Sequence, residues 1–194
     1  MLTRLADRVA AHATWRNVLL LAALAGAGAW VDLRLVAPAF AAATAGTPVF
    51  DLQPGLRPGE IHAQLPLYTA ESLRLYWVFF WLDNLFPLLA FAGLALLWAR
   101  LLAYLPFATG PAWRLTVLVP IPTLLFDWAE NLAFMGLVQA WPAWSPGLAT
   151  LACALHWGKF VCLTIANAGI VLLALAALAA RFRARAAPRE GRAS

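Results

Sequence analysis

Residues 73–99 read LRLYWVFFWLDNLFPLLAFAGLALLWA, and this run decides the fold. It is long and apolar enough to cross a bilayer, which takes about 20 such residues in a helix. The run contains the acid Asp83 and the proline Pro87, which is expected to kink the helix, and Arg100 follows its end. Because lipid cannot satisfy a carboxylate, the run predicts a membrane-spanning helix whose acid faces other helices.

The rest of the chain has the same apolar character. Of its 194 residues, 63% are hydrophobic and 12% are charged, whereas soluble domains are about 45–50% apolar and about 25% charged. Further apolar runs at residues 16–36, 115–140 and 148–180 complete four predicted spans. We therefore predict an all-α integral membrane four-helix bundle, with one transmembrane domain over residues 1–182 and a disordered basic tail over residues 183–194.

An external loop is predicted between the first and second spans. Residues 37–70 contain five prolines and three glycines, and no helical period persists there. Thr69 followed by Glu71 predicts the start of the second helix, with a cap and an acid in its first turn. The first apolar run also fits a signal peptide, but its small-residue site at 43–45 lies too far beyond the apolar centre, which favours an uncleaved span.

Arginine placement predicts the orientation. Residues 1–16 contain three arginines and the segment after residue 180 contains five, whereas the turn between the third and fourth spans contains none. The positive-inside rule then places both termini in the cytoplasm. The preference for arginine, alanine and leucine is typical of a GC-rich bacterial genome, so we expect a bacterial inner membrane. The charge of +5 reflects topology, and membrane lipids, not nucleic acid, are the expected partners.

Ionisable side chains at membrane depth are the candidate functional residues, because each costs about 2.5–3.5 kcal/mol on insertion scales. Five are predicted at that depth, and one of them is the only lysine of the chain: Asp83, Asp127, Glu130, His156 and Lys159. Asp127, Glu130 and Asn131 are spaced i, i+3, i+4, so they share one helical face. His156 and Lys159 share a face in the same way. Both stripes are expected to turn toward the interior of the bundle.

The depths of these groups predict two pairs. At about 1.5 Å per residue, Glu130 lies about 15 Å and Lys159 about 16 Å from the external ends of their helices. Asp83 and His156 lie at about 13 Å and 12 Å on the same scale. We therefore expect Glu130 to pair with Lys159, and Asp83 with His156. Three carboxylates face one lysine, so at least one of them is expected to be neutral at pH 7.

Four further side chains are predicted to line a pocket beside the charged residues, namely Tyr76, Trp128, Trp157 and Asn167. No cofactor motif is present. We expect no metal, because His156 with a carboxylate lacks a third ligand of clear identity. Cys153 and Cys162 lie on opposite helix faces, about 13 Å apart, which is too far for a disulfide and argues against a quinone-linked thiol oxidase.

Three motifs together resemble a known pattern. The second span carries Y-x6-D-x2-F-P, formed by Tyr76, Asp83, Phe86 and Pro87. The third carries D-x2-E-N, formed by Asp127, Glu130 and Asn131, and Lys159 follows in the fourth. The chain resembles, over about residues 66–165, a group of uncharacterised four-span prokaryotic membrane proteins with an external first loop. The resemblance implies that these polar residues act as one unit and implies no particular activity.

Three functions remain open from the sequence, so it does not decide whether the protein is an enzyme. The carboxylates opposite Lys159, together with Pro87, Pro120 and Pro122, suggest a small proton-coupled transporter, which with four helices would act as a homo-oligomer. The Glu130–Lys159 pair suggests instead a membrane-embedded enzyme that acts on a lipid or isoprenoid by acid–base chemistry. Polar side chains also lock helix bundles, which suggests a structural or assembly protein.

Overall fold

The structure, a computed structural model, describes residues 1–186, and the predicted tail lies mostly outside them. Within these residues, four helices are long and apolar enough to cross a membrane: Trp15–Ala43, Ala70–Leu102, Pro111–Ala140 and Pro146–Arg183. The prediction of an all-α four-helix bundle is therefore confirmed. Its elements are α1 (Leu2–His12), α2 (Trp15–Val31), η1 (Asp32–Val36), α3 (Ala37–Ala43), η2 (Phe50–Leu52), α4 (Pro58–Gln64), η3 (Leu65–Leu67), α5 (Ala70–Leu102), α6 (Pro111–Leu115), η4 (Thr116–Leu118), α7 (Ile121–Ala140) and α8 (Pro146–Ala186).

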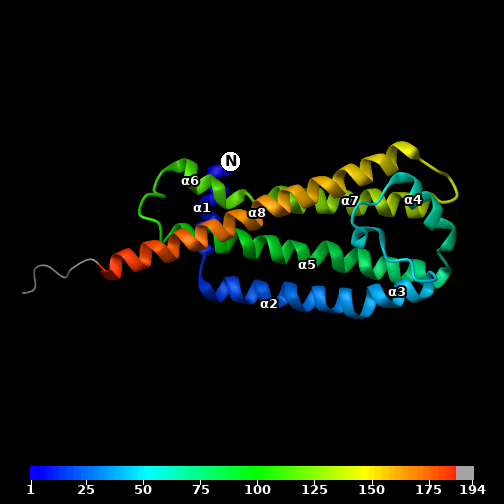
Figure 1. The fold of residues 1–194 in the computed structure, drawn as a ribbon, viewed down its shortest axis with the longest axis horizontal. Coiled ribbons are helices and arrows are strands. Elements are labelled where there is room, and N and C mark those ends of the chain that lie inside the picture. Colours follow the sequence, from blue (N-terminus) through cyan, green and yellow to red (C-terminus); the bar gives the residue numbers. More distant parts are fainter. Residues whose placement is uncertain (187–194) are drawn as a thin grey trace, which may run out of the picture.

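The four long helices run side by side, with α5 at the centre (Figure 1). α2 packs along one side of α5, α7 packs on another side, and α8 packs along α7. We call the end of the bundle that carries residues 44–69 and 141–145 the loop end, and the opposite end the terminal end. One apolar core lies at each end, around Phe50 and Phe134 at the loop end and around Trp98 and Leu173 at the terminal end.

α5 starts where the sequence predicts. The Thr69 hydroxyl accepts a hydrogen bond from the Ser72 backbone N–H at 3.1 Å, and the Thr69 N–H donates to the Ser72 hydroxyl at 2.9 Å. This reciprocal cap gives hydrogen-bond partners to two backbone N–H groups, which the start of a helix otherwise leaves without partners. It fixes the register of the helix that carries Asp83.

The first span is longer than the predicted 16–36, because the helix continues to Ala43. Residues 32–36 form a π-helical segment, and α3 follows with Pro38 in its first turn. Pro38 lies just after the π-helical segment, where the hydrogen-bond pattern already departs from that of an α-helix, so a residue without an N–H is accommodated and the helix continues. The prediction that the loop begins at residue 37 is therefore wrong.

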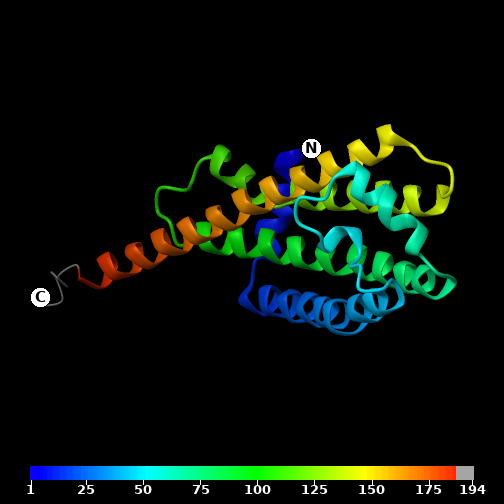
Figure 2. The ribbon, with the colours of Figure 1, turned by 45° about the vertical axis from the view of Figure 1, so that its right-hand side comes forward.

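The connection between the first two spans folds back onto the loop end of the bundle (Figure 2). Its apolar side chains are buried in the core there: Val49, Phe50, Leu56, Ile61 and Leu65. The Phe50 ring lies 5.3 Å from the Phe134 ring of α7 and 5.6 Å from the Tyr68 ring. We call residues 44–69 the plug loop, because aromatic packing of this kind fixes the loop between the helices.

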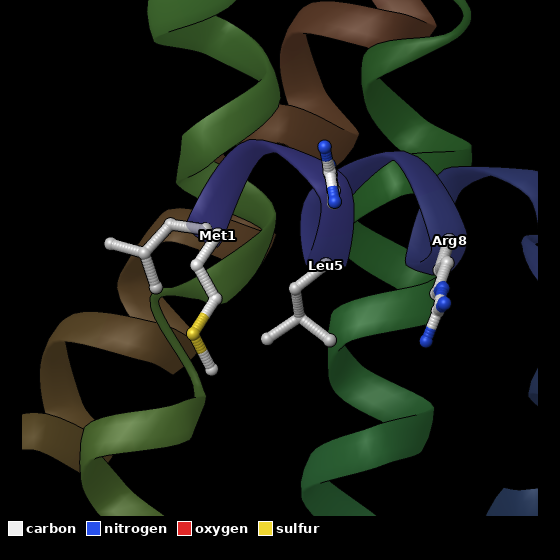
Figure 3. Close-up of a pocket in the computed structure, with 5 residues that line it drawn as sticks. Met1, Leu5 and Arg8 are labelled. Carbon is white, nitrogen blue, oxygen red and sulfur yellow. The ribbon is translucent and has the colours of Figure 1, made fainter.

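Residues 2–12 form a short amphipathic helix, α1, which runs across the bundle at its terminal end (Figures 1 and 2). Ala6 is buried, whereas Leu2 and Leu5 are exposed beside the basic Arg4 and Arg8. Figure 3 shows the side chains of Met1, Leu5 and Arg8 along this helix. They line an open pocket of about 570 Å³. A helix with one apolar and one basic side, lying across the spans, has the form of an interfacial helix.

The contact between α2 and α5 depends on a glycine. A Cβ atom placed on Gly28 would lie 2.7 Å from the Phe86 Cβ, whereas one on Gly26 would meet nothing within 4 Å. The Phe86 Cβ is fixed to its backbone, so the helices would have to separate. We expect Gly28→Ala to lower the free energy of unfolding by about 1–3 kcal/mol, and Gly26→Ala to leave it unchanged or raise it. Thermal unfolding of the two purified variants checks this, and equal stability would contradict it.

Candidate functional site

A single lysine lies at the centre of the buried polar residues in the loop half of the bundle. The Lys159 ammonium, on α8, donates hydrogen bonds to Glu130 Oε1 of α7 at 3.1 Å and to Asp51 of the plug loop. It also forms an ion pair with Asp127 Oδ1 at 3.3 Å. Three carboxylates from two elements therefore surround one cation, which repays part of the cost of burying it.

His156 lies one turn from Lys159 on α8 and extends the network. Its Nδ1 lies 2.7 Å from Glu130 Oε1. The exposed fraction is 1% for His156 and 0% for Glu130, and the imidazole ring packs at 4.9 Å against the Phe160 ring. The contact between His156 and Glu130 is therefore shielded from water. Electrostatic interactions are stronger in such a buried environment than at the protein surface.

Asp83 of α5 is held by α7. The Asn131 amide donates to Asp83 Oδ2 at 3.0 Å and to the Asp83 backbone carbonyl at 3.3 Å. One turn before Asn131 on α7, the Trp128 indole donates a hydrogen bond to the Asn84 backbone carbonyl of α5 at 3.0 Å. These bonds fix α7 against α5 and hold the Asp83 carboxylate beside the lysine-centred group.

The five predicted ionisable residues and Asn131 are all buried and lie together in one cluster. Glu130 pairs with Lys159, as predicted. The predicted pairing of Asp83 with His156 is wrong. α7 packs against both α5 and α8, so it stands between the two residues and supplies their partners. The pairing was predicted from membrane depth alone. Depth indicates which residues lie at the same level, but it does not indicate which helices are neighbours.

The four predicted pocket residues divide into two groups. Tyr76 is buried and its ring packs at 6.2 Å from Phe50, and Trp128 is partly buried at the α5–α7 contact. Neither residue lines the cavity that opens beside the cluster. Trp157 is 60% exposed, because position 157 is turned by about 100° from His156 on the helix.

Asn167 is also exposed. The packed face of α8 changes along its length: Ala152 and His156 are buried in the loop half, whereas Ala166 and Leu173 are buried in the terminal half. The change of face leaves Asn167 on the outer surface. The expectation that Trp157 and Asn167 line a pocket beside the cluster is therefore not met.

Asp51 was not predicted, because it lies in a segment whose composition indicates an external loop. Its neighbours Val49, Phe50 and Leu52 give the signal that could have found it, since an apolar triplet around an acid is unusual in a polar loop. Burial raises the pKa of the Asp51 carboxyl, but the charge of Lys159 and its hydrogen bond to this carboxylate help to outweigh burial, and the pKa lies below its ordinary value of 3.8.

Asp32 is a second buried acid that the sequence did not predict, since it stands at the end of the first apolar run. It is 1% exposed, and neither carboxylate oxygen has a hydrogen-bond partner among the described residues. It is the first residue of the π-helical segment. An apolar run that ends in an acid gives no sign that the helix continues, so the sequence offered no reason to place Asp32 inside.

A cavity of about 450 Å³ opens beside the cluster, between α5, α7, α8 and the plug loop. Its lining includes the charged residues Asp51, Asp83, Asp127 and Lys159. The remainder of the lining is apolar: Leu52, Pro54, Phe86, Phe91, Phe160 and Leu163. The second oxygen of Asp127, Oδ2, is buried and has no hydrogen-bond partner among the described residues. Asp127 is thus a lining residue with a hydrogen-bond acceptor that the described residues leave unused, which is rare for buried polar groups.

Two sets of side chains have the geometry to hold a metal ion. The ligand atoms of Asp51, Glu130 and His156 lie within 4.8 Å of one another, as do those of Asp51, Asp83 and Asp127. Asp51 is therefore the third ligand that the sequence could not identify. In this structure the Lys159 ammonium contacts Asp51, Glu130 and Asp127, so it stands where a bound cation would be expected.

The fold and the site define the class of the protein: a multi-pass membrane protein with a buried charged cluster in one half of its bundle. Comparisons with protein families, curated proteins and solved structures give no match. The resemblance noted from the sequence motifs stays a prediction, and function is argued from the site alone.

The contact between Asp51 and Lys159 gives a stability prediction. We expect Asp51→Ala to lower the free energy of unfolding at pH 7 by about 3 kcal/mol, because it leaves a buried ammonium short of a partner. Asp7→Ala is the control, since Asp7 forms a surface pair with Arg114 at 3.7 Å and both side chains are more than half exposed. Calorimetric unfolding of the two variants in detergent measures the difference, and an equal effect of both would contradict the prediction.

The effect of Asp51 also depends on pH, with a definite sign. A carboxyl whose pKa is lower in the folded state stabilises the protein fully above its ordinary pKa, here 3.8, and loses this contribution as the pH falls through the folded value. The gap in melting temperature between the wild type and Asp51→Ala should be constant from about pH 7 to 5 and shrink below about pH 4. A gap that widens on acidification would refute the argument.

Proposed function

We propose that the protein is a membrane-embedded enzyme that acts on a lipid or isoprenoid by acid–base chemistry. One observation carries the proposal: the cavity joins an apolar wall to the carboxylate of Asp127 and the ammonium of Lys159. Enzyme pockets for apolar substrates combine mostly hydrophobic walls with a few polar groups that fix orientation. The hydrocarbon part of a substrate would lie against Phe86 and Phe160, and its reacting part beside the charged groups.

The network supports a balanced proton transfer. The Asp127 carboxylate takes a proton from the substrate, because its Oδ2 is not engaged by the protein. The Lys159 ammonium gives a proton to another atom of the substrate. The proton on Asp127 then returns to the Lys159 amine across their 3.3 Å contact. Glu130 holds Lys159 in position, with His156 behind it.

The two other functions considered from the sequence draw less support. A transporter needs a path to the terminal end, but below the cluster the bundle is filled by Trp98, Leu102, Val117 and Leu173. A purely structural lock satisfies its own hydrogen bonds. Here Asp127, Glu130 and His156 each keep a buried polar atom without a partner among the described residues.

Deuterium uptake tests the chemistry in a mixture of lipids, so the substrate does not have to be identified first. Proteoliposomes made with a bacterial lipid and isoprenoid extract are incubated in D₂O, and the lipids are analysed by mass spectrometry. We expect one species to gain carbon-bound deuterium, with a rate at least about 100-fold lower for Asp127→Asn, the scale of general acid–base catalysis. Trp157→Phe, a change on the exposed face of α8, is the control. If no species gains deuterium with the wild type, the proposed chemistry is excluded.

We also propose that the protein lies in a bacterial inner membrane with its loop end outside. The support is the distribution of arginine, with three in residues 1–16 and none in residues 141–147. The exposed positions Ser145 and Thr109 lie in turns at opposite ends of the bundle. In a variant without the two native cysteines, a membrane-impermeant maleimide should label Ser145→Cys in intact cells and leave Thr109→Cys unlabelled. The reverse pattern would invert the orientation.

A further inference from the structure

The polar wall of the cavity has more acidic than basic residues. Oxygen atoms of Asp51, Asp83 and Asp127 lie within 4.8 Å of one another, and all three residues line the cavity with Lys159 as the only basic residue. Lys159 is already held by Asp51 and by Glu130 behind the wall. The Lys159 charge is thus shared among several acidic side chains, and it does not balance all the acidic residues of the cavity wall.

Two of the lining carboxylates have hydrogen-bond acceptor capacity that the described residues do not use. Asp127 uses Oδ1 for Lys159 at 3.3 Å, whereas its Oδ2 has no partner among the described residues and is buried. Asp83 receives the Asn131 amide on Oδ2 at 3.0 Å. A carboxylate accepts hydrogen bonds and cannot donate them. The vacant sites at this wall therefore suit a donor group that carries positive charge.

The remaining wall suits both a cation and a hydrocarbon chain. Three phenylalanine rings line the cavity, those of Phe86, Phe91 and Phe160. The Phe160 ring already lies 5.8 Å from the Lys159 ammonium, within the range in which a ring face attracts a cation. A metal ion would take its ligands from the carboxylates and leave most of the apolar wall without a partner, whereas an organic cation with an apolar tail would contact both kinds of wall.

We propose that the cavity binds an amphipathic amine, a molecule with one protonated nitrogen and a hydrocarbon chain. The nitrogen donates to Asp127 Oδ2 and lies near Asp83, and the chain packs against the phenylalanine rings and Leu163. The volume of about 450 Å³ falls in the usual range for small-molecule sites, about 300–1,000 Å³. The inference rests on the proposed function, because it names the class of substrate that the cavity of the proposed enzyme would bind.

Binding of matched twelve-carbon probes tests the inference. Dodecylamine, dodecanol and dodecanoate are titrated calorimetrically into the full-length protein in neutral-lipid nanodiscs, with empty nanodiscs as the blank. We expect dodecylamine to bind at least about tenfold more tightly than dodecanol, the scale of one charge-assisted hydrogen bond. Asp127→Asn should remove this preference and leave dodecanol binding unchanged. Asp7→Asn, on the surface of α1, should retain the preference.

The other outcomes are each decisive. Equal affinity for the amine and the alcohol would show that the cavity selects only the chain, and would overturn the inference. So would Asp127-dependent binding of Mg²⁺ or Zn²⁺ chloride without amine binding, which would make the site a metal site. Because Asp127→Asn can also affect folding, Asp83→Asn is measured beside it, and both variants are compared only where their melting curves show a folded protein.

The two proposals fail independently. If the amine binds selectively but no lipid gains deuterium, the proposed chemistry is excluded and the ligand class stands. If deuterium uptake is found in a neutral or anionic lipid and the amine does not bind, the ligand class is excluded and the chemistry stands.

Discussion

The burial of one ammonium group governs the loop half of this bundle. Lys159 lies where hydrocarbon would surround an unpaired charge, so carboxylates must reach it from the neighbouring elements. Glu130 and Asp127 do so from one face of α7, and Asp51 does so from the plug loop. The contact between α7 and α8, the inward fold of the plug loop at Asp51 and one wall of the cavity all meet at this group.

The plug loop connects this electrostatic requirement to ordinary packing. Phe50 is fully buried among aromatic rings, and this anchors the residue beside it, Asp51, at Lys159. Apolar burial thus supports an ion pair that would be costly by itself. The same loop forms part of the cavity wall through Leu52 and Pro54, so stability and access to the cavity depend on one segment.

The sequence predicted what depends on regular spacing, and it failed where the backbone is irregular. The i, i+3, i+4 spacing was enough to place Asp127, Glu130 and Asn131 on one buried face. Asp51 escaped prediction because no periodicity describes a loop that folds inward, and Asp32 because a π-helical segment extends the first span past an acid. The partners of His156 could not be derived either, since they depend on which helices are neighbours.

The contact of Gly28 with Phe86 has a consequence for selectivity. Phe86 belongs both to the seam between α2 and α5 and to the wall of the cavity. α2, which is exposed over most of its surface, therefore sets how far the Phe86 ring can move away from the cavity. In a homologue with a larger residue at position 28, the seam would open and the ring would be displaced, so the length or bulk of the accepted hydrocarbon chain would change without any substitution among the charged groups.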